Sequence, residues 1–223
     1  MNLLALDTAT ECCSVALLTA AGVLEDHRLA PRQHAALILP MIEGLLAEAG
    51  LTRHALDVIA FGRGPGAFTG LRIAADLAQG LALGLDLPVM PVSTLAALAQ
   101  ASAAQRVLAA LDARLGEVYF GYYTRGGDDL VVADAADGLA PPDAIALPTD
   151  PAWRGVGIGP GWGAYGEVLG ARLGHHIDTV DADVQPRAGG LARLAAAAHA
   201  RGEAVSAELA LPVYLRDRVT HGS

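Results

Sequence analysis

The stretch Gly62-Arg63-Gly64-Pro65-Gly66-Ala67-Phe68-Thr69-Gly70-Leu71-Arg72 decides the fold of this chain. It follows a short apolar run, residues 58–61, which predicts a buried strand, and it precedes an alanine-rich segment with helical spacing. A glycine turn between a strand and a helix exposes backbone N–H groups that can approach a phosphate. The stretch therefore predicts a strand–turn–helix unit, whose turn is either a ligand loop or a rigid structural turn.

The same plan occurs twice along the chain. The pattern Gly-x-Gly-Pro-Gly at residues 62–66 recurs at residues 157–161, and the strand end Leu6-Asp7 recurs as Leu111-Asp112. Each half is expected to run in the order hairpin, helix, strand and helix. We therefore expect an α/β protein with two lobes, each a mixed sheet flanked by helices. The lobes are residues 1–105 and residues 106–223, and the second ends in a C-terminal tail.

The hydrophobic periodicity and the turn residues predict the individual elements. In the first half we expect strands at 3–6, 13–18, 23–27, 58–61 and 89–91, and helices at 33–49, at 69–83 and from Thr94. Pro40 predicts a kink or break in the first helix, Thr69 is expected to cap the second, and Ser93 the third. In the second half we expect strands at 107–111, 117–124, 130–134, 155–158 and 176–180, and helices at 166–173 and 191–201. Residues 141–150 are poorly patterned and are expected to be a loop or a frayed helix.

The charge composition excludes several functions. All 15 cationic side chains are arginine, so a P-loop lysine, a Schiff-base lysine and a lysine general base are absent. A net charge of −9 argues against a free-standing nucleic-acid-binding protein, because neutralising phosphates needs a concentrated positive surface. Any contact with RNA is therefore expected to run through a partner.

The sequence predicts a cytoplasmic protein with no membrane segment. No uninterrupted apolar run reaches the roughly 18 residues that a membrane span needs. The first residues lead directly into a predicted strand, without the basic, apolar and cleavage segments of a signal peptide. The two cysteines, Cys12 and Cys13, are adjacent, so we expect them to be reduced and buried rather than paired.

Short motifs spread over the whole chain identify a family. They are Leu6-Asp7-Thr8-Ala9-Thr10, Leu39-Pro40-Met41, residues 62–72, Ala78-Gln79-Gly80-Leu81-Ala82, Val92-Ser93-Thr94-Leu95, Asp112-Ala113-Arg114, Gly116-Glu117-Val118-Tyr119 and Pro212-Val213-Tyr214-Leu215-Arg216. Together these blocks resemble the TsaB family of bacterial tRNA threonylcarbamoyladenosine biosynthesis proteins, in the actin, sugar-kinase and chaperone ATPase superfamily. The resemblance implies a duplicated actin-like (ribonuclease H-like) fold.

The resemblance also implies a non-catalytic scaffold subunit. Such a subunit is required for threonylcarbamoylation of N6 of the adenosine next to the anticodon in tRNA. It pairs with a homologous catalytic, metal-binding subunit that is TsaD-like, and with a small TsaE-like ATPase. Alone it would form a homodimer, and it would reach tRNA only through the complex. The His-x-x-x-His metal pair of the catalytic paralogue is absent, since Ile38 stands four residues after His34, so no metal site is expected.

The superfamily turns provide candidates for nucleotide or phosphate binding. They are Asp7, Thr8, Thr10, Gly64, Gly66, Thr69, Asp112 and Arg114. The alternative is structural: the side chains of Asp7, Thr8 and Thr10 bond nearby backbone groups, the glycines make a rigid turn, and Asp112 pairs with Arg114. The only candidate cofactor is ATP or ADP at a subunit contact.

Two predicted helices have more apolar circumference than one core contact needs. A single contact requires a stripe about 100° wide, whereas residues 33–49 and 69–83 are apolar over a wider range. The extra surface predicts a partner interface, with burial inside the fold as the alternative. The interface candidates are Ile38, Ile42, Leu45, Leu46, Ala74, Ala78 and Leu81.

Two other functions compete with the scaffold role. The superfamily turns suit an autonomous ATP-dependent phosphotransferase, which would also need a carboxylate base and a substrate pocket. A metallopeptidase of the glycoprotease type is the third candidate, although no His-Glu-x-x-His pattern supports it.

Overall fold

Strand β1 (Leu3–Asp7) lies at the centre of the first of two sheets in the computed structural model, which describes residues 1–216. The first sheet has the order β3-β2-β1-β4-β5. β1 pairs antiparallel with β2 and parallel with β4, so the chain starts with an antiparallel meander and continues with parallel crossovers. The elements of this part are β2 (Cys12–Thr19), β3 (Gly22–Leu29), α1 (His34–Glu48), η1 (Arg53–Ala55), β4 (Val58–Gly64), α2 (Phe68–Leu85), β5 (Val89–Ser93) and α3 (Thr94–Gln100).

The second sheet repeats this topology, as the sequence predicted. Its order is β11-β10-β6-β7-β8, in which β6 pairs antiparallel with β7 and parallel with β10. β6 and β10 therefore correspond to β1 and β4. The elements are β6 (Arg106–Asp112), β7 (Val118–Arg125), β8 (Val131–Ala133), β9 (Gly138–Ala140), β10 (Gly155–Ile158), α4 (Pro160–Leu173), η2 (Gly174–His176), β11 (Ile177–Asp181), α5 (Ala188–Ala200) and η3 (Ala207–Leu209).

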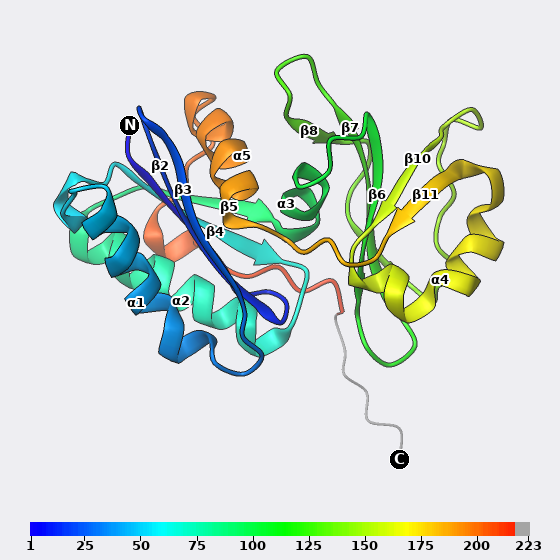
Figure 1. The fold of residues 1–223 in the computed structure, drawn as a ribbon, viewed down its shortest axis with the longest axis horizontal. Coiled ribbons are helices and arrows are strands. Elements are labelled where there is room, and N and C mark those ends of the chain that lie inside the picture. The colour runs from blue at the N-terminus through cyan, green and yellow to red at the C-terminus, as the bar shows by residue number, and fades with distance from the viewer. Residues whose placement is uncertain (217–223) are drawn as a thin grey trace.

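Helices cover both faces of the first sheet (Figure 1). Leu4 and Leu6 pack with α1 and α2 on one face, whereas Leu3 and Ala5 pack with α5 on the other. Successive side chains of a strand point to opposite faces, so a strand buried on both faces reads as a continuous apolar run. All five residues of β1 are buried, so its sequence is apolar throughout and predicts a strand. Such a run does not indicate which helix covers which face of the sheet.

Helix α5 does not belong to the lobe in which the sequence placed it. It lies in the second half of the chain, yet Leu191, Ala192 and Ala195 pack with Leu3 and Ala5 of the first sheet. The first structural lobe is therefore built from two separate segments, and the division at residues 105 and 106 does not describe it. The physical reason is that α1 and α2 cover only one face of the first sheet. The apolar side chains on the other face, such as Leu3 and Ala5, are buried by α5.

Several local predictions need correction. α1 is one continuous helix through Pro40, because the exposed proline removes a single backbone bond while Ile38 and Met41 stay packed in the core. Thr69 does not cap α2; Ala67 is the capping residue, and Thr69 lies inside the helix. α4 begins at Pro160 rather than 166, with a kink at Tyr165. Ser93 caps α3 as predicted, since its Oγ accepts from the N–H of Ala96.

Candidate functional site

Two turns at the carboxyl end of β1 and β4 pack directly against each other. The first turn, residues 8–11, joins β1 to β2, and the glycine turn, residues 65–67, joins β4 to α2. The N–H of Ala67 donates to the carbonyl of Ala9 at 2.7 Å, and the Thr8 hydroxyl donates to the carbonyl of Gly70 at 2.7 Å. These bonds bring the two candidate phosphate turns of the first lobe into contact.

Glycine is required at this contact because the two backbones approach closely. A Cβ atom at Gly70 would lie 1.9 Å from the carbonyl oxygen of Thr8. A Cβ atom at Gly66 would lie 2.5 Å from the carbonyl oxygen of Ala9. The glycine turn is therefore closed against the first turn, and its glycines serve a packing contact between main chains.

The polar side chains of both lobes bond to their own turns. Asp7 Oδ1 accepts from the N–H of Ala9 at 3.0 Å, and Thr10 Oγ1 accepts from the N–H of Cys12 at 3.2 Å. In the second lobe, Asp112 Oδ1 accepts from the N–H of Arg114 at 2.7 Å, and its Oδ2 pairs with the Arg114 guanidinium at 2.9 Å. These contacts match the structural alternative for each residue. Nucleotide binding by these residues stays a prediction.

The remaining two candidates lie at the same end of the first lobe. Gly64 has a φ of 110°, a conformation that favours glycine, and a Cβ atom there would lie 2.7 Å from the carbonyl oxygen of Val213. Thr69 is exposed on the first turn of α2. The structure thus brings the first-lobe candidates together. In the second lobe, Asp112 ends β6 and Arg114 lies in the turn after it, at the place that corresponds to the end of β1.

A buried carboxylate and a buried hydroxyl flank Gly62. Asp7 Oδ2 and Thr94 Oγ1 are buried without a hydrogen-bond partner among the described residues. A Cβ atom at Gly62 would lie 2.1 Å from Asp7 Oδ2 and 3.3 Å from Thr94 Oγ1, so only glycine leaves room for both. Burial raises the pKa of Asp7 to about 6, although the bond from the Ala9 N–H opposes this rise. Sequence reasoning did not name Thr94 as a site residue, although it follows the capping residue Ser93 and belongs to the family motif Val92-Ser93-Thr94-Leu95.

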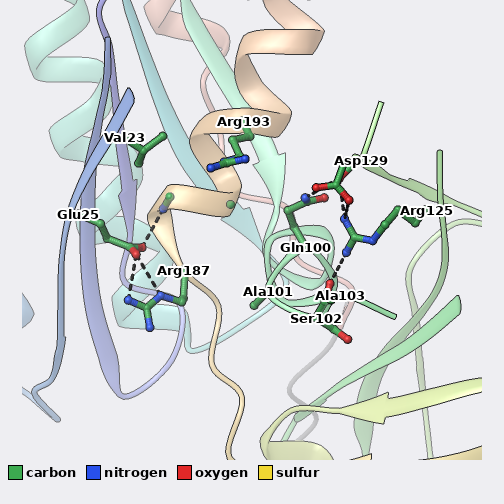
Figure 2. A pocket seen from close by; sticks show the side chains of 12 residues that line it. Val23, Glu25, Gln100, Ala101, Ser102, Ala103, Arg125, Asp129, Arg187 and Arg193 are labelled. Atoms are coloured by element: carbon green, nitrogen blue, oxygen red, sulfur yellow. Dashed lines mark hydrogen bonds and ion pairs between the residues drawn. The ribbon is translucent and has the colours of Figure 1, made fainter. Parts of the chain in front are cut away.

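A cleft of about 450 Å³ lies between β3, the start of α5, the end of α3 and the β7–β8 hairpin (Figure 2). Its charged groups are largely paired within the chain. Arg187 pairs with Glu25 at 2.9 Å, and Glu25 also accepts from the N–H of Gly189 at 2.8 Å. Arg125, whose side chain is only 9% exposed, pairs with Asp129 at 3.1 Å. The sequence did not predict this cleft, because its walls come from distant segments.

The predicted interface residues need correction. Six of the seven are buried in the first-lobe core against the sheet and each other: Ile38, Ile42, Leu45, Leu46, Ala74 and Ala78. Leu81 is half-buried. The wide apolar faces of α1 and α2 pack against the sheet and against each other. These six side chains are therefore not available to contact a partner.

No three or more His, Cys, Asp or Glu side chains within residues 1–216 come together in a way that could hold a metal ion. In the same part of the chain, every helix is too short or too polar to cross a membrane.

Two sheets of the same topology, each with an antiparallel start and a parallel strand–glycine turn–helix unit, define a protein of the duplicated actin-like class. A family model described as TsaD, tRNA N6-adenosine threonylcarbamoyltransferase, matches residues 25–154. Two relatives named tRNA threonylcarbamoyladenosine biosynthesis protein TsaB match nearly the whole chain. The one from Haemophilus influenzae is 41% identical over 99% of this chain and 95% of its own length. The one from Escherichia coli is 40% identical over 98% and 96%.

Solved structures agree with these matches. A Pseudomonas aeruginosa crystal structure described as similar to peptidase YeaZ superposes with a TM-score of 0.90 and 49% identity, covering 96% of this chain and 99% of that one. A second structure, YeaZ from Pseudomonas aeruginosa, superposes with a TM-score of 0.88 and 48% identity over the same shares. The chain belongs to the TsaD-type family that the model describes and, within it, to the TsaB family.

The close contact at Gly70 predicts a large difference between two glycines of α2. Gly70→Ala should destabilise the protein by about 2 kcal/mol or more, because the new methyl group collides with the Thr8 carbonyl. Gly84→Ala should stabilise it by about 0.5–1 kcal/mol, because a Cβ there meets nothing within 4 Å. Urea unfolding measures both. Equal effects at the two positions would contradict a packing role for Gly70.

The raised pKa of Asp7 predicts an unusual pH dependence. The folded pKa of about 6 exceeds the ordinary value of 3.8, so the native state holds the proton more tightly. The contribution of Asp7 to the free energy of unfolding is therefore greatest below pH 4 and decreases as the pH rises towards 6. Above pH 6 the free energy of unfolding is about 3 kcal/mol lower than it would be at low pH from this group alone. Asp7→Asn should remove this loss, since the amide has no charge to desolvate and can still accept from the N–H of Ala9.

The measurement is urea unfolding of the wild type and Asp7→Asn at pH 4 and pH 7.5. The variant should gain stability relative to the wild type at pH 7.5 and lose most of that gain at pH 4. Asp143→Asn, at an exposed aspartate, controls for the loss of one charge. A gain for Asp7→Asn that is the same at both pH values would refute the raised pKa.

Proposed function

We propose that this chain is a non-catalytic scaffold subunit for the threonylcarbamoylation of N6 of the adenosine next to the anticodon in tRNA. The nearly full-length likeness to relatives named TsaB supports the pathway. The observation that carries the scaffold role is the closure of the candidate turns, whose polar groups bond within the chain. A phosphotransferase would need these groups to face a nucleotide.

The proposed partners follow from this role. A homologous TsaD-like catalytic subunit would hold the metal and carry out the transfer, and a small TsaE-like ATPase would act on the pair. The TsaD-type family model that matches this chain supports a partner of the same fold. With a net charge of −9, the chain would reach tRNA only through the complex, in the cytoplasm. Any ATP or ADP would be held at a subunit contact.

The outer face of α1 and α2 is the proposed partner surface. Five members are exposed, namely Leu39, Gly44, Gly80, Leu83 and Gly84, and two, Ile73 and Leu77, are half-buried against the first-lobe core. This set is called the outer α1–α2 face. Leu39 and Leu83 are 47% and 61% exposed. A Cβ atom at Gly44, Gly80 or Gly84 would meet nothing within 4 Å, so packing inside the chain does not require glycine there.

The glycines on this face favour a partner helix. Each glycine inside a helix lowers stability by roughly 0.5–1 kcal/mol relative to alanine. A neighbouring helix that approaches closely would offset this cost, because the missing side chains let two backbones come together. A partner of the same fold would bring two equivalent helices to the contact. The homodimer and the complex with the catalytic subunit would then use one surface and compete.

This surface predicts the effect of a charge at Leu83. Leu83→Glu should weaken binding to the TsaD-like subunit at least tenfold, equal to about 1.4 kcal/mol, because a carboxylate would be buried without a partner. The melting temperature should stay within a few degrees of the wild type, since Leu83 is exposed in the free chain. Leu147→Glu, at a 43% exposed leucine of the second lobe, is the matched control.

Binding is measured by calorimetric titration, and the oligomeric state by light scattering. Normal assembly of both Leu83→Glu and Leu39→Glu would exclude the outer α1–α2 face. The scaffold role itself is tested with the reconstituted subunits, in which tRNA modification should require this chain. ATP hydrolysis by the pure chain, abolished by Asp7→Ala, would instead establish the phosphotransferase alternative.

A further inference from the structure

The chain leaves η3 as an extended segment, residues 211–216, which is called the strap. It runs along the first lobe and ends at the second (Figure 1). The N–H of Val213 donates to the carbonyl of Arg63 at 2.7 Å. The Tyr214 ring lies 5.3 Å from the Phe68 ring, and its hydroxyl accepts from Arg72 Nε at 3.2 Å. The first half of the strap is therefore fastened to the end of β4 and the start of α2.

The second half of the strap is fastened to the other lobe. Leu215 packs against the second-lobe core. Arg216 Nε donates to Glu117 Oε2 at 3.1 Å, and its Nη2 reaches the same carboxylate and the carbonyl of Arg114 at 3.4 Å. The Arg216 and Glu117 side chains are 19% and 31% exposed, so this ion pair is partly shielded from water.

The residues that Arg216 contacts belong to a strained turn. This second turn, residues 113–117, joins β6 to β7 and has three consecutive positive φ values, 61° at Arg114, 56° at Leu115 and 78° at Gly116. Arg114 and Leu115 carry side chains that disfavour this conformation. Leu115 is 78% exposed, so packing of its side chain does not compensate. Such backbone persists where surrounding contacts hold it in place.

We infer that the strap is a latch that holds the second turn in its strained conformation and couples it to the start of α2. The Arg216 guanidinium contacts both ends of the turn, the carbonyl of Arg114 and the carboxylate of Glu117. Tyr214, two residues earlier, is held by Phe68 and Arg72, and the Arg72 guanidinium lies 3.8 Å from the centre of the Phe68 ring. Loosening either end of this short segment therefore loosens the other.

Hydrogen–deuterium exchange of the full chain tests the latch. In Arg216→Ala, exchange of the backbone amides at residues 112–118 should rise about tenfold or more, while those of β1 keep their wild-type rates. Arg154→Ala is the matched control, because it removes an ion pair with Asp178 in the same lobe, away from the strap. If Arg216→Ala does not fold, Glu117→Gln weakens the same ion pair with less disturbance.

Two further variants separate a latch from a fraying tail. Tyr214→Ala should also raise exchange at residues 112–118, because it loosens the far end of the strap. In a Leu115→Gly background, Arg216→Ala should have a smaller effect, since glycine adopts a positive φ without strain. The inference is overturned if Arg216→Ala or Tyr214→Ala speeds exchange only at residues 211–216. An undiminished effect of Arg216→Ala in the Leu115→Gly background would overturn the role of strain.

Discussion

The direct packing of the glycine turn on the first turn is the constraint on which the first lobe depends. Backbone meets backbone there, with the Thr8 hydroxyl bonded to the carbonyl of Gly70 and the N–H of Ala67 bonded to the carbonyl of Ala9. Because Gly70 lies in the first turn of α2, this contact sets where the helix starts relative to β1. The rest of α2 then lies along the sheet, with Ala74 and Ala78 against it, and α1 packs beside it.

The second lobe also packs glycines of its strand–turn–helix unit closely, there against the main chain of strand β6. A Cβ atom at Gly159 would lie 2.5 Å from the carbonyl oxygen of Ala110, and one at Gly161 would lie 2.8 Å from the carbonyl carbon of the same residue. In both copies of the Gly-x-Gly-Pro-Gly pattern a larger residue would collide with neighbouring atoms, although the atoms that it would meet differ between the two lobes. Close packing of main chain on main chain at the glycine turn agrees with the scaffold role proposed above.

Asp7 and Thr94, which both lie beside Gly62, are among the residues with a buried polar atom that has no hydrogen-bond partner in the described part of the chain. Each has one polar atom without a partner among the described residues, at the carboxyl end of the central strand and at the start of α3. An unpaired buried carboxylate lowers stability at neutral pH, so the fold tolerates a local cost here. Several charged groups of the cleft beside α5, by contrast, are paired within the chain, as in the Arg187–Glu25 and Arg125–Asp129 pairs.

The sequence by itself determined the features that depend on residues close along the chain. The strand before the glycine turn, the helix after it, the Ser93 cap and the repetition of the plan are all local, and each was predicted correctly. The residues of the candidate turns were also named, because hydroxyls, carboxylates and glycines are informative within a few positions. Only the tertiary structure decided which element covers each apolar surface. Apolar periodicity indicates how wide the apolar face of a helix is, but it does not indicate what packs against that face. For that reason Ile42 and Ala78 are core residues rather than interface residues, and α5 packs on the first lobe. Thr94 and Asp7 both lie beside Gly62, and Arg216 reaches Glu117 from 99 residues away.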